Sequence, residues 1–312
     1  MTGDRTAHPL LISLANILAD FHMKSTHNAF VLLALLPVPK FLEKNKKIRG
    51  TLGDRLLHEC LDFVLQPLKI GAAIGIMMND PLGNCRYCFT PCASYMVDMQ
   101  EALMLAGVAG KTSHLTIADY KMFGDSFRHE PRTASLMLTQ RHIIRTKTHP
   151  RDDLAAYLRE AKKFRLNGVD NLFWRDWPGA EPSNFFTPEP LHHWHKAFWD
   201  HDAKWCIQAV GAEEIDFQFS ILPHRIRFHQ FKEGISKIKQ VTGQEHHDIE
   251  RYMVPVIADA VPKNFLIAIR ALMDFRYLAQ APEIDETDCK NIENALQEFH
   301  AHKDAILKVG AR

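Results

Sequence analysis

The sequence predicts an α/β protein whose strands lie in the first third of the chain and whose remainder is mostly helical. Three observations predict this class. Short apolar runs of strand length occur within the first 110 residues, and a stretch with apolar residues three and four apart lies among them. After about Gly110 the strand signals fade and helical patterns dominate. The early order of strand, strand, helix, hairpin, strand and helix suits an α/β layer with a functional edge at its strand ends.

Two strands and a helix open the chain. Pro9–Ile17 and Phe30–Val38 are apolar, partly β-branched runs bounded by polar or proline-containing segments, so each predicts a buried strand. From Leu52 to Leu68 the apolar residues recur at spacings of three and four, after a Thr51 that can cap a helix. This pattern predicts an amphipathic helix that ends near Pro67.

A hairpin and a strand–helix unit follow. Ile74–Met78 and Arg86–Thr90 flank a segment of Asn, Asp, Pro and Gly, whose dihedral preferences are those of a turn, so this region predicts a β-hairpin. Cys92–Val97 predicts a short strand. Asp98 lies at the carboxyl end of that strand, directly before a predicted helix over Met99–Ala106.

The later part of the chain carries helix start and stop signals, without an internal repeat or a low-complexity linker. Aspartate and threonine residues stand where helix caps are expected, and Asn167-Gly168 marks a helix end. The predicted helices run from Asp152 or Asp153 to Phe164, from Thr187 to about Val210, from Glu245 to Ala260, from Asn264 to Ala279 and from Thr287 to Lys308.

The charges of the whole chain nearly cancel, at 38 basic and 37 acidic residues, so no global field would draw the protein onto DNA. Any nucleic-acid surface must therefore be local. The best candidate is a basic run that contains a single acid, Glu43. Its cations are Lys40, Lys44, Lys46, Lys47 and Arg49. They can contact phosphates, and the simpler alternative is a solvated loop after a strand.

We predict neither a membrane span nor a secretory leader. The longest apolar run, Ala29–Leu42, is interrupted by Pro37 and Pro39 and is shorter than the roughly 20 residues that cross a bilayer. Pro9–Ala19 is similar to the apolar part of a signal peptide, but Asp4 precedes it and no cleavage pattern is clear. We therefore expect a protein that has no membrane partner and is not secreted.

The six cysteines are scattered, which fits reduced thiols in a cytosolic or nuclear compartment better than a disulfide framework. Cys85, Cys88 and Cys92 form a C-x2-C-x3-C pattern that provides half of a zinc site, but no second pair follows at a suitable spacing. A zinc-binding structural protein is therefore an alternative that ranks below free cysteines.

Carboxylates suited to metal-assisted phosphoryl transfer occur at three places. This chemistry needs several carboxylates around two cations about 3.5–4 Å apart. Asp98 follows a strand and suits this role, although it can simply cap the next helix. Glu189 and His192 can share one face of a first helical turn, while Glu245 opens a helix whose dipole alone favours an acid. An alternative zinc triad would consist of His192, His195 and His201.

Six stretches, in order along almost the whole chain, resemble the Plavaka transposases of the CACTA-like group, which are abundant in mushroom-forming fungi. They are Thr6–Ile17, Ala34–Pro39, Phe127–Arg132, Pro190–Lys196, Gln240–His246 and Ala271–Gln280. The resemblance implies a ribonuclease-H-like core with a D-D-E site for Mg²⁺ and a helical insertion before the Glu. The predicted organisation is an incomplete ribonuclease-H-like core lacking its first strand (1–110), a helical insertion (111–240) and C-terminal helices that complete the core (241–312).

The resemblance also assigns roles to individual residues. It places the second Asp of the D-D-E site at Asp98 and the Glu at Glu245, with Glu250 as the alternative. Asp98 and Glu245 would hold the Mg²⁺ and carry out catalysis. The Asp/Cys-x-x-His signature of the wider group falls on Glu189 and His192, with Glu in place of Asp, and gives these two residues an auxiliary role.

Two departures from the family pattern change the expected activity. The first Asp of the family lies on a strand that precedes Pro9–Ile17, whereas Asp4 follows the place where that strand would end. Lys111–His114 stands in place of a cysteine-containing motif. We therefore expect a truncated, transposon-derived protein that is nuclear, or alternatively cytoplasmic, and inactive in DNA cleavage. The alternative is a non-catalytic remnant that binds DNA through the Lys40–Arg49 run or binds proteins. Expected partners are transposon-end DNA, a second copy of the chain and a full-length transposase.

Overall fold

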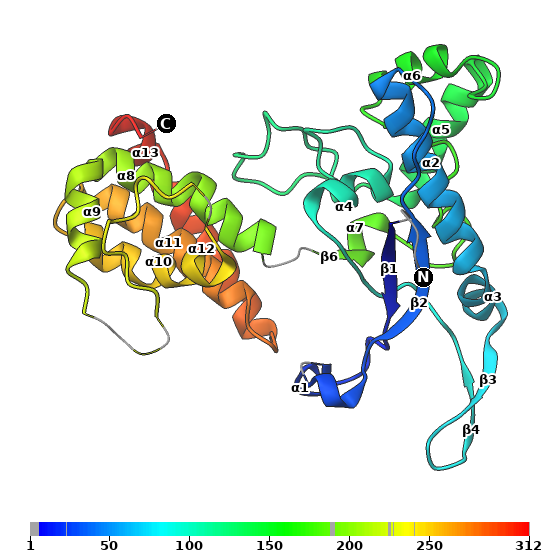
Figure 1. Ribbon diagram of the computed structural model, residues 1–312, viewed down its shortest axis with the longest axis horizontal. Coiled ribbons are helices and arrows are strands. Elements are labelled where there is room, and N and C mark those ends of the chain that lie inside the picture. The colour runs from blue at the N-terminus through cyan, green and yellow to red at the C-terminus, as the bar shows by residue number, and fades with distance from the viewer. Residues whose placement is uncertain are drawn as a thin grey trace. The chain divides into compact units, whose positions relative to one another are not determined.

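The computed structural model describes residues 6–22, 24–187, 191–223, 226, 228–239 and 241–311. The chain forms two compact units, Met1–Pro188 and Glu189–Arg312 (Figure 1). Each unit contains its own cluster of buried apolar residues. The division falls inside the predicted helical insertion, and the predicted three-part organisation stays a prediction.

The first unit is mixed α/β. Its strands are β1 (Ala7–Ile12), β2 (Val31–Pro37), β3 (Ile76–Asn79), β4 (Cys85–Cys88), β5 (Tyr95–Met96) and β6 (Phe186–Thr187). Its helices are α1 (Ala19–His22), η1 (Ser25–His27), α2 (Lys46–Val64), α3 (Gln66–Ile74), α4 (Met99–Ala106), α5 (Ala134–Lys147), α6 (Leu154–Lys163) and α7 (Pro182–Phe185).

The strands among the described residues form three separate two-stranded sheets. β1 pairs with β2 and β3 pairs with β4 in antiparallel register, whereas β5 and β6 are parallel. The predicted hairpin is therefore confirmed as β3 and β4. The mixed α/β class is also confirmed, while the ribonuclease-H-like core stays a prediction.

The two opening strands are more exposed than the sequence predicted. β1 ends at Ile12 instead of Ile17. Leu36 is buried and Leu10 packs against the core of the unit, but most other side chains of the two strands are exposed. The prediction of two buried strands is wrong, because a continuous apolar run was interpreted as a strand covered on both faces.

The predicted helix over Leu52–Leu68 consists of two helices. α2 begins earlier, at Lys46, where the Asn45 side chain accepts hydrogen bonds from the backbone N–H groups of Lys47 and Ile48. It ends at Val64, and α3 follows with Pro67 in its first turn. Proline suits that position because the first N–H groups of a helix have no partner inside the helix.

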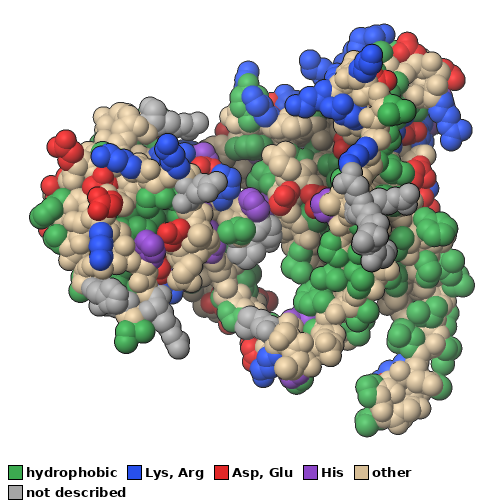
Figure 2. Space-filling model, viewed as in Figure 1, with side chains coloured by type: hydrophobic (Ala, Val, Ile, Leu, Met, Phe, Trp, Pro, Cys, Tyr) green, Lys and Arg blue, Asp and Glu red, His purple; other side chains and the backbone are tan. Residues whose placement is uncertain are grey.

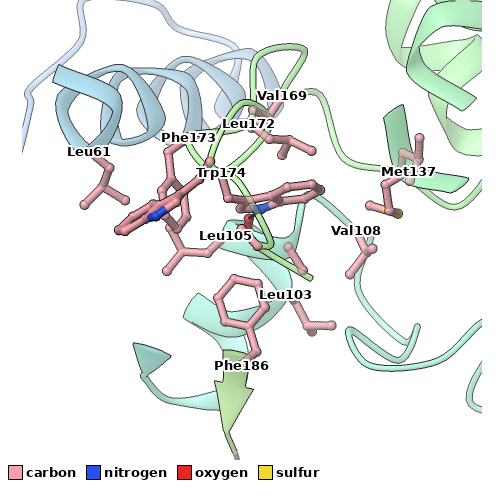
Figure 3. Packing of buried hydrophobic residues seen from close by; sticks show 14 of the residues in the cluster. Leu61, Leu103, Leu105, Val108, Met137, Val169, Leu172, Phe173, Trp174 and Phe186 are labelled. Atoms are coloured by element: carbon pink, nitrogen blue, oxygen red, sulfur yellow. Dashed lines mark hydrogen bonds between the residues drawn. The ribbon is translucent and has the colours of Figure 1, made fainter. Parts of the chain in front are cut away.

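The core of the first unit surrounds Trp174 (Figure 3). Leu61 of α2, Leu105 of α4 and Met137 of α5 are fully buried with it. The indole Nε1 of Trp174 donates to the Leu105 carbonyl oxygen at 3.0 Å, which satisfies the one polar group of this large side chain. Burial of each such side chain contributes about 1.5–3 kcal/mol. The core therefore joins α2, α4 and α5 into one body.

The second unit is helical throughout its described elements. These are η2 (Leu191–Lys196) and η3 (Phe198–Ala203), both π-helical, α8 (Lys204–Val210), α9 (Ala212–Ser220), α10 (Gly243–Ile257), α11 (Lys263–Ala279), α12 (Glu286–His302) and α13 (Asp304–Lys308). Phe198, Ile249 and Phe265 are buried at the centre of this bundle.

The late helices follow the sequence prediction with two corrections. α10 and α11 lie close to the predicted ranges, and α6 begins after Asp153, whose side chain accepts from the Ala156 N–H at 2.8 Å. Thr187 belongs to β6 and not to a helix, and the helix predicted from it is π-helical in its first part. The last predicted helix is divided at Lys303. Of the described helices, none combines the length and apolar character that a membrane crossing requires.

Candidate functional site

Asp98 lies between β5 and α4 in the first unit and caps the helix. Its backbone is extended, its side chain is exposed, and its Oδ1 accepts a hydrogen bond from the Glu101 N–H at 2.8 Å. Burial raises the pKa of the half-buried Glu101 carboxyl, and the nearby Asp98 charge raises it further, while His8 lowers it. The carboxylate of Asp98 thus performs the capping role that the sequence offered as its simplest explanation.

Glu245 forms a capping box at the start of α10 in the second unit. Its Oε2 accepts from the Thr242 N–H at 2.8 Å and from the Thr242 hydroxyl at 2.9 Å, and its own N–H donates to that hydroxyl oxygen. The backbone hydrogen bond from Thr242 lowers the pKa of the Glu245 carboxyl, and His229 contributes in the same direction. Glu245 is therefore an anion at neutral pH whose charge the helix start stabilises.

The alternative acid, Glu250, is buried on the same helix. Both of its carboxylate oxygens lie 3.3 Å from Nδ1 of His195, which belongs to η2. The rings of His195 and His247 are 5.5 Å apart. The η2 and α10 helices, far apart in the sequence, therefore meet where an imidazole lies within hydrogen-bond distance of a buried carboxylate.

Glu189 is the one predicted site residue that lies outside the residues that the structure describes, and Asp4, which the sequence places outside the site, is not described either. His192 lies half-buried in η2. The predicted pairing of Glu189 with His192 therefore stays a prediction.

Asp98 belongs to the first unit and Glu245 to the second, so a magnesium site that joins them stays a prediction. Within the described parts of the chain, no three His, Cys, Asp or Glu side chains are grouped so that they could hold a metal ion. The carboxylates of both acids already accept hydrogen bonds from helix N-termini. The roles of Asp98 and Glu245 as Mg²⁺ ligands therefore stay predictions.

The cysteine-based zinc site gains no support from the structure, while the triad of His192, His195 and His201 stays a prediction. Cys85 donates to the Asn79 side chain at 2.9 Å across the hairpin, and burial raises the pKa of the Cys92 thiol to about 12. A thiol with so high a pKa is a poor metal ligand at neutral pH, because the thiolate is the form that binds.

The two units differ in charge, although the chain as a whole is nearly neutral. Residues 1–188 contain 23 Lys and Arg against 18 Asp and Glu, whereas residues 189–312 contain 15 against 19. The first unit is therefore basic and the second acidic, which the total charge conceals.

The predicted basic run is exposed at the start of α2. Lys46, Lys47 and Arg49 lie in the first turns of this helix, and Lys40 and Lys44 lie in the segment before it. Among the described residues, neither Lys46 nor Lys47 forms an ion pair. Their charges are therefore available at the surface of the unit.

The same surface continues onto α5 and α6. The guanidinium of Arg55 lies 5.8 Å from the Tyr157 ring centroid, and Gly168 packs between Thr51 of α2 and Leu158 of α6. Figure 2 shows Lys and Arg side chains gathered where Figure 1 places α6 and the start of α2. The exposed cations of α5, α6 and the loop between them are Arg145, Lys147, Arg151, Arg159, Lys162 and Lys163.

Acids neutralise only part of this basic surface, which we define as the exposed cations of α2, α5, α6 and the α5–α6 loop. Glu160 pairs with Lys163 and, at 3.6 Å, with Lys147, and Asp170 pairs with Arg145 at 3.7 Å. The sequence held a signal for this extension, because cations recur every few residues from 141 to 165. The sequence interpretation missed it because it considered one run at a time.

A family model described as Plavaka transposase matches residues 1–206. The match contains the whole first unit and the η2 and η3 helices of the second. No curated protein and no solved structure matches the chain.

Proposed function

Because the chain belongs to the Plavaka transposase family, we propose that it is a transposon-derived protein that binds DNA through the basic surface of its first unit, and that by itself it does not cut DNA. The observation that carries the proposal is the continuity of that surface across three helices. Lysine and arginine side chains neutralise phosphates and release condensed counterions, which gives affinity that does not depend on sequence.

The position of α2 adds to this proposal. Its N-terminus carries the positive end of the helix dipole, and Lys46, Lys47 and Arg49 place their charges at that end. Such an arrangement attracts anions and repels positively charged surfaces. We infer that the DNA backbone lies across the start of α2 and continues over α5 and α6.

The proposed lack of cleavage rests on the two acids that the resemblance assigns to catalysis. Asp98 and Glu245 both cap helices, so a metal ion would have to compete with backbone N–H groups for their oxygens. Mg²⁺ demands near-ideal octahedral geometry, which a ligand already held by a helix does not easily provide. Glu250, buried beside His195, is the second candidate for the late acid of the family.

The remaining parts of the proposal follow from DNA as the ligand. We propose that the protein is nuclear, and that transposon-end DNA is the natural target. A second copy or a full-length transposase as a partner, and the CACTA-like and fungal origin, stay predictions.

Two assays on the same labelled duplex DNA with transposon ends test the two parts of the proposal, binding and the lack of cleavage. The variant Lys46→Gln/Lys47→Gln/Arg49→Gln should weaken binding and reduce the slope of log K against log salt by about 0.9 for each phosphate that it no longer neutralises. A matched control, Lys263→Gln/Lys290→Gln/Lys308→Gln, removes three exposed cations of the second unit and should leave the slope unchanged.

The same DNA, incubated with Mg²⁺ or Mn²⁺ and separated on a denaturing gel, should remain uncut. Equal salt slopes for the two triple variants would contradict the proposed binding surface. Metal-dependent cutting that Asp98→Asn abolishes would contradict the proposed lack of cleavage.

A further inference from the structure

A long loop that contains neither helices nor sheets connects α4 to α5. Residues 108–132, all of them described, are fixed by isolated bridges that join Thr112 to Asp119 and Thr116 to Pro131. Arg132 is buried, and its Nε donates to the carbonyl oxygens of Ser113 and Thr116, both at 3.1 Å. Ordered loops of this length in compact proteins usually have a function.

This loop exposes three aromatic rings. The exposed fractions are 55% for Tyr120, 58% for Phe123 and 66% for Phe127. An exposed aromatic side chain does not contribute the favourable free energy that its burial in a core would give. Next to Tyr120, Asp119 is buried, pairs with Arg165 and accepts the Lys121 N–H at 2.8 Å. All three rings therefore face solvent, and side-chain contacts hold the backbone beside the first of them.

Cations accompany the rings. The Nζ of Lys111 lies 5.5 Å from the centroid of the Tyr120 ring, and Lys121 and Arg128 are exposed in the same loop. Of the loop's acids, Asp119 pairs with Arg165, and the Asp125 carboxylate is hydrogen-bonded to His129 at 3.0 Å. Three exposed cations, Lys111, Lys121 and Arg128, therefore accompany the rings and complement phosphate.

We propose that the loop from 108 to 132 binds single-stranded nucleic acid, with unpaired bases stacked on the rings of Tyr120, Phe123 and Phe127 and phosphates contacted by Lys111, Lys121 and Arg128. Aromatic rings and neighbouring cations are the combination by which proteins hold single strands without reading sequence. In a duplex the bases are stacked on one another, so the rings cannot reach their faces. This inference rests on the proposed function, since it assigns a second form of the same ligand to a second surface of the first unit.

Fluorescence anisotropy with two probes of equal length, a labelled oligo-dT and a labelled duplex, tests the inference on the full chain. The Phe123→Ala/Phe127→Ala variant should raise the Kd for oligo-dT by about tenfold or more, because base–aromatic stacking is removed. Its Kd for the duplex should change by less than about twofold. The conservative variant Phe123→Trp/Phe127→Trp should retain oligo-dT binding, with indole fluorescence quenched as the strand binds.

The matched controls are Phe63→Ala on α2, where the side chain is 84% exposed, and Phe217→Ala on α9, where it is 56% exposed. Neither should affect oligo-dT binding. Three results would overturn the inference: unchanged oligo-dT binding in the double alanine variant, equal weakening for both probes, or a loss of self-association without a loss of oligo-dT binding.

The two proposals fail in distinguishable ways. Duplex binding that depends on Lys46, Lys47 and Arg49, with no oligo-dT binding by the unmodified chain, would refute the loop and leave the basic surface. A chain that binds neither probe would refute both.

Discussion

His58 shows how a polar residue becomes part of the core of the first unit. Its ring is buried on α2, with Nε2 3.2 Å from the Met104 carbonyl oxygen and Nδ1 accepting from the Phe173 N–H at 3.1 Å. These partners fix the neutral tautomer that carries its proton on Nε2. Burial lowers the pKa of His58 from 6.5 to about 4, and the nearby Arg141 and Arg175 contribute in the same direction.

This shift predicts a loss of stability in acid. The folded-state pKa lies below the unfolded value, so the unfolded chain takes up the proton first as the pH falls. Stability is complete above pH 6.5 and declines as the pH falls towards about 4, by about 3 kcal/mol in the free energy of unfolding. Denaturant unfolding of the unmodified chain and of His58→Gln should show a steeper pH dependence for the unmodified chain. His142→Gln, on the exposed side of α5, should behave like the unmodified chain, and equal slopes for all three proteins would refute the prediction.

Single residues also mark the limit of the sequence interpretation. A helix cap and a metal ligand call for the same residue type at Asp98, and only the hydrogen bond to Glu101 shows that capping takes place. The pairing of Glu250 with His195 had no local signal, because 55 positions separate the two residues. Contacts of that range depend on how whole helices pack, which neither periodicity nor capping rules specify.

At the scale of elements, prediction succeeded where the local chain determines the structure. The β3–β4 hairpin follows from its turn residues, and Asp80 accepts from the backbone N–H groups of Leu82 and Asn84 as such a turn requires. The start of α6 follows from Asp153. Prediction failed where contacts with distant parts of the chain determine the structure. Examples are the exposure of β1 and the π-helical form of η2.

The capping of α4 by Asp98 predicts how substitutions at this position change the stability of the protein. Asp98→Ala removes the acceptor of the Glu101 N–H and should lower the free energy of unfolding by about 1 kcal/mol. Asp98→Asn keeps an oxygen acceptor and should cost much less, because Asn caps helices about as well as Asp. Denaturant unfolding of the two variants measures the difference. If Asn were as costly as Ala, the charge and not the cap would be the important property of Asp98.

At the scale of the whole molecule, the chain contains two hydrophobic cores that share no residue. Leu105 and Ile249 are both fully buried, the first on α4 and the second on α10. Replacement of either by Ala should cost about 2–5 kcal/mol. Hydrogen exchange read by mass spectrometry should rise in peptides of the first unit for Leu105→Ala and of the second for Ile249→Ala. Increases in both units for both variants would show that the cores unfold together.

The overall composition of the chain gave the least information about its function. The near-zero charge argued against a general attraction to DNA, but it is the sum of a basic first unit and an acidic second unit. The division between the units, after Pro188, has no glycine-rich or charged linker to announce it. Both facts emerge only when residues are grouped by their position in space.

The short parallel pairing of β5 with β6 has a mechanical consequence. Tyr95 is opposite Phe186 and Met96 is opposite Thr187, and the hydroxyls of Ser94 and Thr187 lie 3.0 Å apart. A pulling force on the backbone that follows Thr187 would therefore load the strand that leads directly into Asp98. Such a force, which a bound partner would exert on the chain after β6, would be transmitted through this pairing both to the start of α4 and to Phe186, which is buried in the core of the first unit.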